Sequence, residues 1–157
     1  MAKPGNALIF FVKMHPEIQI DMDDLIKLSF YTAYIGGNGY VYLKYEGTPV
    51  LLHRLIMGLP EGEVDHRNQD RLDVRKENLR VATRPQNSFN KQLPAHNKSG
   101  YKGVSWDKLS NRWVAKIEIE GRQLNLGRYK EKEEAALAYN KAALKYHREF
   151  ASLNQIP

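Results

Sequence analysis

The feature that most restricts the fold of this chain is a series of three short segments of alternating polarity, followed by an alanine-rich amphipathic segment. The alternating segments cover residues 101–106, 112–118 and 122–126, and residues 131–146 carry the helical pattern. Alternation with a period of two predicts strands whose apolar side chains share one face of a sheet. Small residues such as Ala135 and Ala142 would let the helix pack closely on that face. We therefore expect a three-stranded antiparallel sheet with a helix on one face and a polar face left open.

The first half of the chain predicts a separate mixture of short helices and strands. A glycine-rich turn at residues 36–39 lies between two β-prone segments, which indicates a hairpin. The expected elements are a helical turn at 23–28, strands at 31–35 and 40–45, a helix at 51–57, strands at 64–66 and 78–82, and a helix from residue 83. The polar stretch of residues 91–99 indicates a linker. We therefore expect an α+β protein with domains at residues 1–90 and 100–157.

The positive charge of the chain is concentrated in its last third. Residues 1–50 carry 4 basic and 5 acidic side chains, residues 51–90 carry 7 and 6, and residues 91–157 carry 13 and 7. The last segment alone therefore accounts for the net charge of +6. A basic module beside a near-neutral one favours a polyanionic partner such as nucleic acid, although solubility alone is the simpler alternative.

The composition excludes several classes of protein. The chain has no cysteine, which excludes a disulfide framework, a thiolate zinc site and a cysteine nucleophile. No apolar segment approaches the roughly 20 residues required to span a bilayer. The apolar residues 7–12 lack the basic start and the cleavage site of a secretory signal. We therefore expect an intracellular protein, in the cytoplasm of a bacterial or phage-infected cell, with no membrane partner.

A group of hard ligands accompanies the strand–loop–strand–helix pattern that begins at residue 64. Asp65 and His66 end the first strand, Asn78 begins the second, and Asn87 lies in the helix. Carboxylate and amide oxygens suit a magnesium-type ion, and a neutral imidazole can deprotonate water. A metal there would accept charge from a phosphate oxygen and its leaving group. Asp-His pairs are also common in surface loops, so the residues alone leave a structural role open.

The residues around this group carry a family resemblance. The run VDHRNQDRLDVRKENLR at residues 64–80, with Ala82-Thr83 and Gln86-Asn87, resembles the HNH nuclease motif and its ββα-metal fold. Residues 52–56 (LHRLI) resemble the helix that precedes this motif in phage- and intron-type members. Two positions depart from the family pattern: Val74 stands where relatives often have Asn, and Gln69 where they often have Gly. Neither departure removes a catalytic group, but both suggest a less open loop.

The HNH resemblance implies a role for each polar residue of the motif. His66 would be the general base that activates water, and Asp65 and Asn87 would ligate one divalent ion, Mg²⁺ or Mn²⁺. Asn78 would hydrogen-bond across the loop and hold the histidine strand in place. His53 would contact a phosphate or the metal shell.

The last third of the chain carries a second, independent resemblance. Residues 99–106 (SGYKGVSW), together with Arg112-Trp113, Leu126-Gly127, Glu134-Ala135-Ala136, Ala138-Tyr139 and residues 151–154, look like an AP2 DNA-binding domain. The resemblance implies that the sheet lies in the major groove of double-stranded DNA. The side chains expected on its open face are Lys102, Ser105, Arg112, Lys116, Glu118, Gln123, Asn125 and Arg128. Each of them is alternatively a solvated surface residue. Trp106 and Trp113 are expected mainly to pack, with contact to the sugar–phosphate backbone as the alternative for Trp106 at its strand end.

The two resemblances, in this order, are those of an HNH–AP2 homing endonuclease. They imply a metal-dependent, site-specific endonuclease that hydrolyses phosphodiester bonds. One such site cuts one strand, so a double-strand break would need a dimer, a second visit or a rearrangement, and the choice between monomer and homodimer stays open. The alternative is a non-catalytic sequence-specific DNA-binding protein with a vestigial nuclease domain. A zinc-stabilised module is disfavoured because the five histidines are scattered and cysteine is absent. Residues 1–50 would either complete the nuclease core or form an additional DNA-contacting arm.

Overall fold

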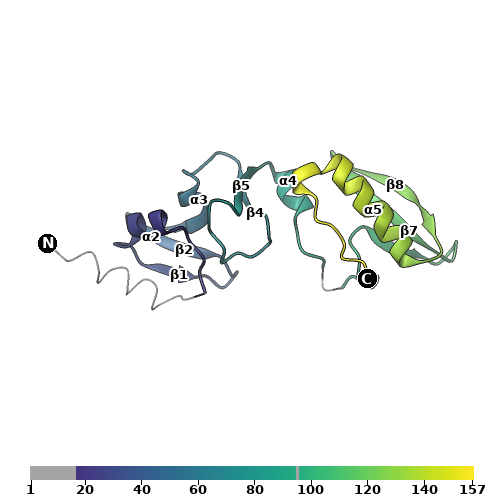
Figure 1. Cartoon of the computed structure of the whole chain (residues 1–157), viewed down its shortest axis with the longest axis horizontal. Coiled ribbons are helices and arrows are strands. Elements are labelled where there is room, and N and C mark those ends of the chain that lie inside the picture. The colour runs from purple at the N-terminus through teal and green to yellow at the C-terminus, as the bar shows by residue number, and fades with distance from the viewer. Residues whose placement is uncertain (1–16, 95) are drawn as a thin grey trace. The chain divides into compact units, whose positions relative to one another are not determined.

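The chain forms two compact units in a computed structural model that describes residues 17–94 and 96–157 (Figure 1). The first unit ends at Thr83 and the second runs from Arg84 to Pro157. The helix at residues 84–89 is therefore grouped with the second unit, and the domain bounds expected from the sequence stay a prediction. The apolar segment of residues 7–12 lies outside the described residues.

The first unit contains a three-stranded antiparallel sheet formed by β1 (Ala33–Ile35), β2 (Val41–Tyr45) and β3 (Thr48–Leu51), in that order. The expected hairpin is confirmed as β1 and β2, in which Tyr34 pairs with Tyr42. The sequence pattern does not predict β3, because Pro49 argues against a strand. The proline is tolerated since β3 lies at the edge of the sheet, where a missing N–H disturbs no neighbouring strand.

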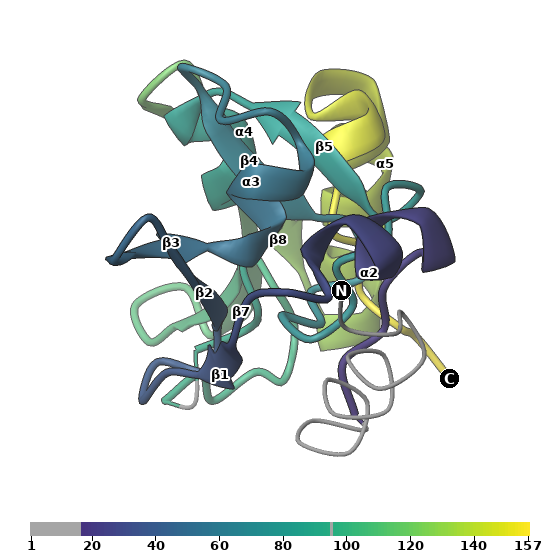
Figure 2. The same cartoon turned by 90° about the vertical axis from the view of Figure 1, so that its left-hand side faces the viewer.

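Helix α2 (Met22–Leu28) belongs to the same unit (Figure 2). Its Leu25 lies in the core of this unit. The core also contains Val41 and Leu43 from β2 and Leu52 from the start of helix α3 (Leu52–Ile56). Val74, in the loop that contains the expected site, is fully buried in the same cluster. The departure from the family pattern at this position therefore has a structural reason, because the valine anchors the loop in the core.

Strands β4 (Glu63–His66) and β5 (Leu79–Ala82) form an antiparallel pair. A twelve-residue loop joins them, and helix α4 (Arg84–Phe89) follows β5. The strand–loop–strand–helix order expected from the sequence is confirmed. Gln69, at the turn of this loop, has a φ of 65°, which lies in the left-handed region. That conformation explains why glycine suits this position, since glycine adopts it without a steric penalty.

The second unit contains the sheet that the alternating pattern predicts. Strands β6 (Val104–Asp107), β7 (Arg112–Ile119) and β8 (Arg122–Tyr129) are antiparallel, and helix α5 (Lys132–Tyr146) covers one face (Figure 1). The short 3-10 helix η1 (Arg148–Phe150) follows α5. Ala135 and Ala142 of α5 are buried, as the small-residue stripe predicts. The α+β class and the three-stranded sheet packed on one helix are therefore confirmed.

Gly103 lies where the residues before β6 pack against α5. Its φ is 73°, and an added Cβ would overlap the ring of Tyr139 and lie 2.5 Å from the carbonyl oxygen of Lys116. The Gly103 carbonyl also accepts a 2.8 Å hydrogen bond from the Lys116 N–H. Only glycine meets both the conformational and the steric requirement. None of the helices in the described part of the chain has the length and apolar character needed to cross a bilayer.

Candidate active site and nucleic-acid interface

Strand β4 ends in two polar side chains that are withdrawn from solvent. Asp65 and His66 are each 5% exposed. Arg80 lies opposite Asp65 on β5, and its Nε and Nη2 donate to Oδ2 of Asp65 at 2.8 and 2.6 Å. Arg80 is also buried, so water does not screen this ion pair. The pair fixes the orientation of the Asp65 carboxylate and neutralises its charge.

The imidazole of His66 is one member of a cluster of rings, which we call the ring cluster: Tyr40, His53 and His66. The centroids of the two imidazoles are 4.8 Å apart, and Tyr40 lies 5.4 Å from His53 and 6.0 Å from His66. The guanidinium of Arg71 lies over Tyr40, 4.7 Å from the ring centroid. Tyr40 directly precedes β2, so the turn between β1 and β2 contributes a ring to the candidate site. One of the two roles left open for residues 1–50, completion of the nuclease core, gains support from this contact.

Burial keeps both imidazoles of the ring cluster in the neutral form. It is the main cause that lowers the pKa of His66, and it outweighs the opposing effect of Asp65, Asp70 and Asp73. Burial, the neighbouring His66 and Arg54 together lower the pKa of His53 to about 3. A neutral imidazole can accept a proton at pH 7, so His66 is suited to act as a base. His53 is 4% exposed, which favours packing against His66 over an open contact with a phosphate.

The loop between β4 and β5 is held by side chains inside it. The amide of Asn78 accepts from the Asn68 N–H at 3.0 Å and donates to the Asp73 carbonyl at 2.7 Å. The Asp73 carboxylate is 1% exposed and bonds to Asn68 and to both Nε and Nη2 of Arg75. The hydrogen bonds from Arg75 hold the pKa of Asp73 below its usual value. Asn78 therefore bonds across the loop, while Asp73 and Arg75 are contributors that the sequence reasoning did not single out.

The two expected metal ligands are chemically suited to a hard cation, because Asp65 offers a carboxylate oxygen and Asn87 an amide oxygen. Among the described residues, no group of three or more acidic or histidine side chains is placed to hold a metal ion. A site built from Asp65 and Asn87 has two protein ligands, and water and phosphate oxygens would complete its coordination. Because Arg80 neutralises Asp65, we expect the affinity of this pair for a cation to be low without DNA.

Asn87 lies on α4 and therefore belongs to the second unit, whereas Asp65 and His66 belong to the first. That Asp65 and Asn87 ligate the same metal ion stays a prediction.

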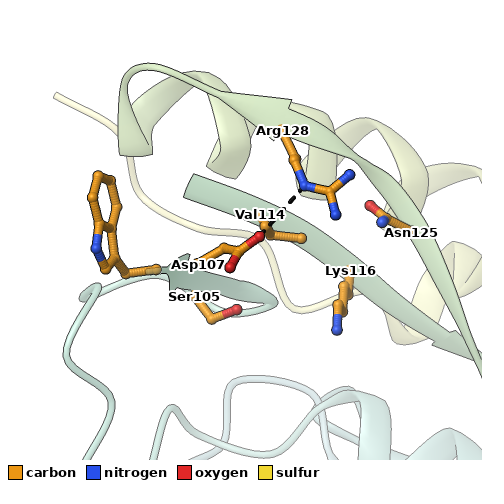
Figure 3. A pocket seen from close by; sticks show the side chains of 7 residues that line it. Ser105, Asp107, Val114, Lys116, Asn125 and Arg128 are labelled. Carbon is orange, nitrogen blue, oxygen red and sulfur yellow. Dashed lines mark hydrogen bonds and ion pairs between the residues drawn. The ribbon is translucent and has the colours of Figure 1, made fainter. Parts of the chain in front are cut away.

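The uncovered face of the β6–β8 sheet contains a hollow of about 350 Å³ (Figure 3). Its lining residues come from all three strands: Ser105, Trp106, Asp107, Val114, Lys116, Asn125 and Arg128. Four of these, Ser105, Lys116, Asn125 and Arg128, are among the eight residues expected on the open face. The sheet register explains this grouping, since Ser105, Val114 and Arg128 are neighbours across the strands, as are Lys116 and Asn125.

Three more of the expected residues lie on the same open face: Arg112 and Glu118 on β7, and Gln123 on β8. Glu118 pairs with Gln123 beyond Lys116, and both are exposed. Arg112 pairs with Asp107 at the other end of β7 and is half-buried. The polar face expected from the alternation is therefore present, and of the expected residues only Lys102 is directed elsewhere. The ammonium of Lys102 donates instead to the carbonyls of Phe89 and Lys91, at 2.5 and 2.8 Å.

Asp107 is a residue of this face that the sequence reasoning did not single out. Its Oδ2 lies 3.5 Å from Nε of Arg128 (Figure 3). The same oxygen accepts a 2.7 Å hydrogen bond from the Ser110 hydroxyl. The Ser110 hydrogen bond is the main cause that keeps the pKa of Asp107 below its usual value. The carboxylate therefore stays ionised and restricts the guanidinium of Arg128. Alternation along β6 places Asp107 on the face of Ser105, which is the sequence signal for it.

Comparison with known proteins agrees with this arrangement of elements. A sequence model described as HNH endonuclease matches residues 50–89, from β3 to α4, and an AP2 domain model matches residues 99–149. An uncharacterized HNH endonuclease of Acanthamoeba polyphaga mimivirus is 33% identical over 144 residues, which cover 87% of this chain and 74% of that protein. Protein 3.8 of Escherichia phage T7 is 38% identical over 68 residues, 43% of this chain and 56% of that protein. No solved structure matches the chain.

The segment from β4 to α4 has the strand–loop–strand–helix order and lies within the residues matched by the HNH model, and the β6–β8 sheet with α5 lies within those matched by the AP2 model. The chain belongs to the HNH endonuclease family and carries an AP2 domain. These findings indicate a nuclease that acts on DNA.

Proposed function

We propose that the protein is a divalent-metal-dependent, site-specific endonuclease of the homing type, which hydrolyses phosphodiester bonds of double-stranded DNA. The observation that carries the proposal is the buried, neutral imidazole of His66 at the end of β4, next to the carboxylate of Asp65. A base that is neutral at pH 7 and fixed by packing suits the activation of water. The relatives are viral, which supports action on DNA inside an infected cell.

In this mechanism the chain supplies a base and a rigid frame. His66 accepts the proton of the attacking water, while Tyr40 and His53 restrict the plane of its ring. Arg80 holds Asp65, and Asn78 with Asp73 holds the loop that follows His66. Asp65 and Asn87 are the residues that would hold one Mg²⁺ or Mn²⁺ ion. The bound ion would stabilise the negative charge that develops on the phosphate and on the departing 3′-oxygen.

The open face of the second unit would select the cleavage position. Ser105, Arg112, Lys116, Glu118, Gln123, Asn125 and Arg128 offer donors and acceptors toward a major groove. Asp107 restricts Arg128, so its guanidinium meets the bases with less conformational freedom. The basic excess of residues 91–157 adds attraction to phosphates that does not depend on sequence.

The test is incubation of supercoiled plasmid with the full chain and Mg²⁺ or Mn²⁺. Wild type should nick or linearise the plasmid, and His66→Ala should reduce the rate by at least about a hundredfold, because it removes the general base. EDTA should also abolish cleavage. His96→Ala is the matched control, because His96 is an exposed histidine of the second unit. Equal cleavage by wild type and His66→Ala would show that the base is wrongly assigned.

The second candidate function is sequence-specific DNA binding with a vestigial nuclease unit. The specific observation in its favour is the Asp65–Arg80 ion pair, which neutralises a carboxylate expected to hold the metal. This candidate predicts that wild type and His66→Ala bind a labelled duplex equally and that neither cleaves plasmid with Mg²⁺ or Mn²⁺. Run-off sequencing of cleaved plasmid separates nicking from double-strand cleavage and gives the target sequence if the first candidate is correct.

A further inference from the structure

Helix α4 is attached to the second unit by a stacked pair of rings. The rings of Phe89, at the end of α4, and His147, after α5, have centroids 3.7 Å apart and are tilted by only 5°. His147 is buried, and its Nε2 lies 2.7 Å from the backbone carbonyl oxygen of Glu118 on β7. One imidazole therefore connects α4 to a strand of the open sheet.

A second contact fixes the end of the same helix. The ammonium of Lys102, just before β6, donates to the backbone carbonyls of Phe89 and Lys91. The last carbonyls of a helix lack partners within the helix and carry partial negative charge, so a lysine there satisfies and stabilises them. Burial lowers the pKa of Lys102 to about 8, which agrees with an ammonium withdrawn from solvent. We call Lys102, Phe89 and His147 the α4 clamp.

Together these contacts hold α4, and with it Asn87, within the second unit. Asp65 and His66 lie on β4 of the first unit, while Asn87 lies two residues before Phe89 on a helix held by the second unit. The second unit is the one with the open polar sheet face. A shift of α4 within this unit would displace Asn87, and displacements of about 1 Å can reduce catalysis a hundredfold.

We infer that the α4 clamp makes Lys102, Phe89 and His147 positioning residues for Asn87, one of the two expected metal ligands. The inference rests on the proposed function. It gives Lys102 a different role from the DNA contact expected from the sequence.

The first experiment measures α4 itself, without reference to activity. Amide hydrogen exchange of peptides covering residues 84–91 is followed in the full chain for wild type, Lys102→Met, Phe89→Ala and the control Lys141→Met. Lys141 is exposed on α5 and carries the same charge. Exchange in α4 should rise by about tenfold in the two clamp variants and stay at the wild-type rate in the control. Unchanged exchange in both clamp variants would overturn the inference.

The second experiment separates affinity from rate. Binding to a labelled 30-bp random-sequence duplex is measured at several salt concentrations, and nicking of supercoiled plasmid is measured with Mg²⁺. Lys102→Met should bind like Lys141→Met, within about twofold and with the same salt slope, yet nick at least about tenfold more slowly. Lys102→Arg and Phe89→Tyr, which retain the donors and the stack, should restore most of the rate.

Three outcomes would contradict the inference. If Lys102→Met reduces affinity and lowers the salt slope by about 1 relative to the control, Lys102 contacts a phosphate instead. If α4 exchanges faster but the nicking rate is unchanged, the position of α4 does not matter to cleavage. If the conservative variants fail to restore the rate although tryptophan fluorescence shows a folded second unit, the clamp geometry is not the cause. A wild type that never nicks would refute the proposed function, and the exchange experiment would still decide whether the clamp holds α4.

Discussion

At the scale of single residues, the candidate base is defined by burial as much as by its type. His66 and His53 lie edge to face, and each also contacts Tyr40. Removing imidazoles from water disfavours their charged forms, so the same packing that fixes His66 also keeps it ready to accept a proton. The energetic consequence is a dependence of stability on pH.

The first prediction concerns that dependence. The pKa of His53 falls to about 3 in the folded unit, against 6.5 when unfolded. Between these values the unfolded chain binds a proton that the folded unit does not, so stability rises with pH and is lost as the pH falls below 6.5. Going from pH 7 to pH 5 should lower the free energy of unfolding of the first unit by about 2 kcal/mol through His53.

His53→Phe keeps a ring at this place and should remove that part of the pH dependence. The measurement is urea unfolding followed by circular dichroism at both pH values. Both tryptophans, Trp106 and Trp113, lie in the second unit, so tryptophan fluorescence reports that unit separately. The control is the exposed His96→Phe, and an identical pH dependence in His53→Phe and wild type would contradict the prediction.

The second prediction concerns Gln69, whose φ of 65° strains a residue with a side chain. Gln69→Gly should raise the free energy of unfolding of the first unit by about 0.5–1 kcal/mol, because relief of the left-handed conformation exceeds the entropy that glycine adds to the unfolded chain. Gln123→Gly, in an extended strand, should instead destabilise the second unit. Urea unfolding with the two signals described above tests both, and destabilisation by Gln69→Gly would show that its side-chain contacts dominate.

At the scale of secondary-structure elements, periodicity and turn chemistry account for most of what is observed. The segments expected at 112–118 and 131–146 correspond to β7 and α5 within one residue at each end. The sequence pattern fails to predict an element where local signals conflict, as in β3, which contains Pro49. Strand β6 begins at Val104 and not at Tyr101, because Gly103 with its φ of 73° interrupts the extended backbone.

The third prediction concerns the contact between these elements at Gly103. Gly103→Ala should lower the free energy of unfolding of the second unit by about 3 kcal/mol or more, because the methyl group would overlap Tyr139 and the Lys116 carbonyl. Gly121→Ala is the matched control, since Gly121 has a φ of 76° but no atom within 4 Å of an added Cβ. It should lose only about 1 kcal/mol, the cost of the left-handed conformation. Urea unfolding by tryptophan fluorescence measures both, and equal losses would contradict the steric argument.

At the scale of the whole molecule, the two units have different tasks under the proposed function. The first holds His66 and Asp65, and the second presents the open sheet face and carries α4. The division agrees with the charge distribution, since the entire net charge of +6 lies in residues 91–157. Substitutions on the face should therefore change binding to DNA before they change the chemistry.

The fourth prediction tests this division. Lys116→Ala, and separately Arg112→Ala, should weaken binding to duplex DNA and reduce its salt slope by about 1, because each removes one cation from the face. Lys141→Ala, on the helix that covers the opposite face, should leave the slope unchanged. Filter binding or fluorescence anisotropy at several salt concentrations gives the slopes. Wild-type slopes for both Lys116→Ala and Arg112→Ala would show that the face is wrongly assigned.

The sequence by itself determined the order of elements except β3, the polar face of the second sheet and the residues of the motif, because these depend on local spacing, turn residues and alternation. Only the tertiary structure decided the partners of those residues. Asp65 meets Arg80 through strand register, Tyr40 contacts His53 and His66 from the residue before β2, and Lys102 turns to the end of α4. The physical reason is that contacts between distant segments are selected by burial and hydrogen bonding in the folded chain, where a lysine with unpaired carbonyls nearby has a better partner than water.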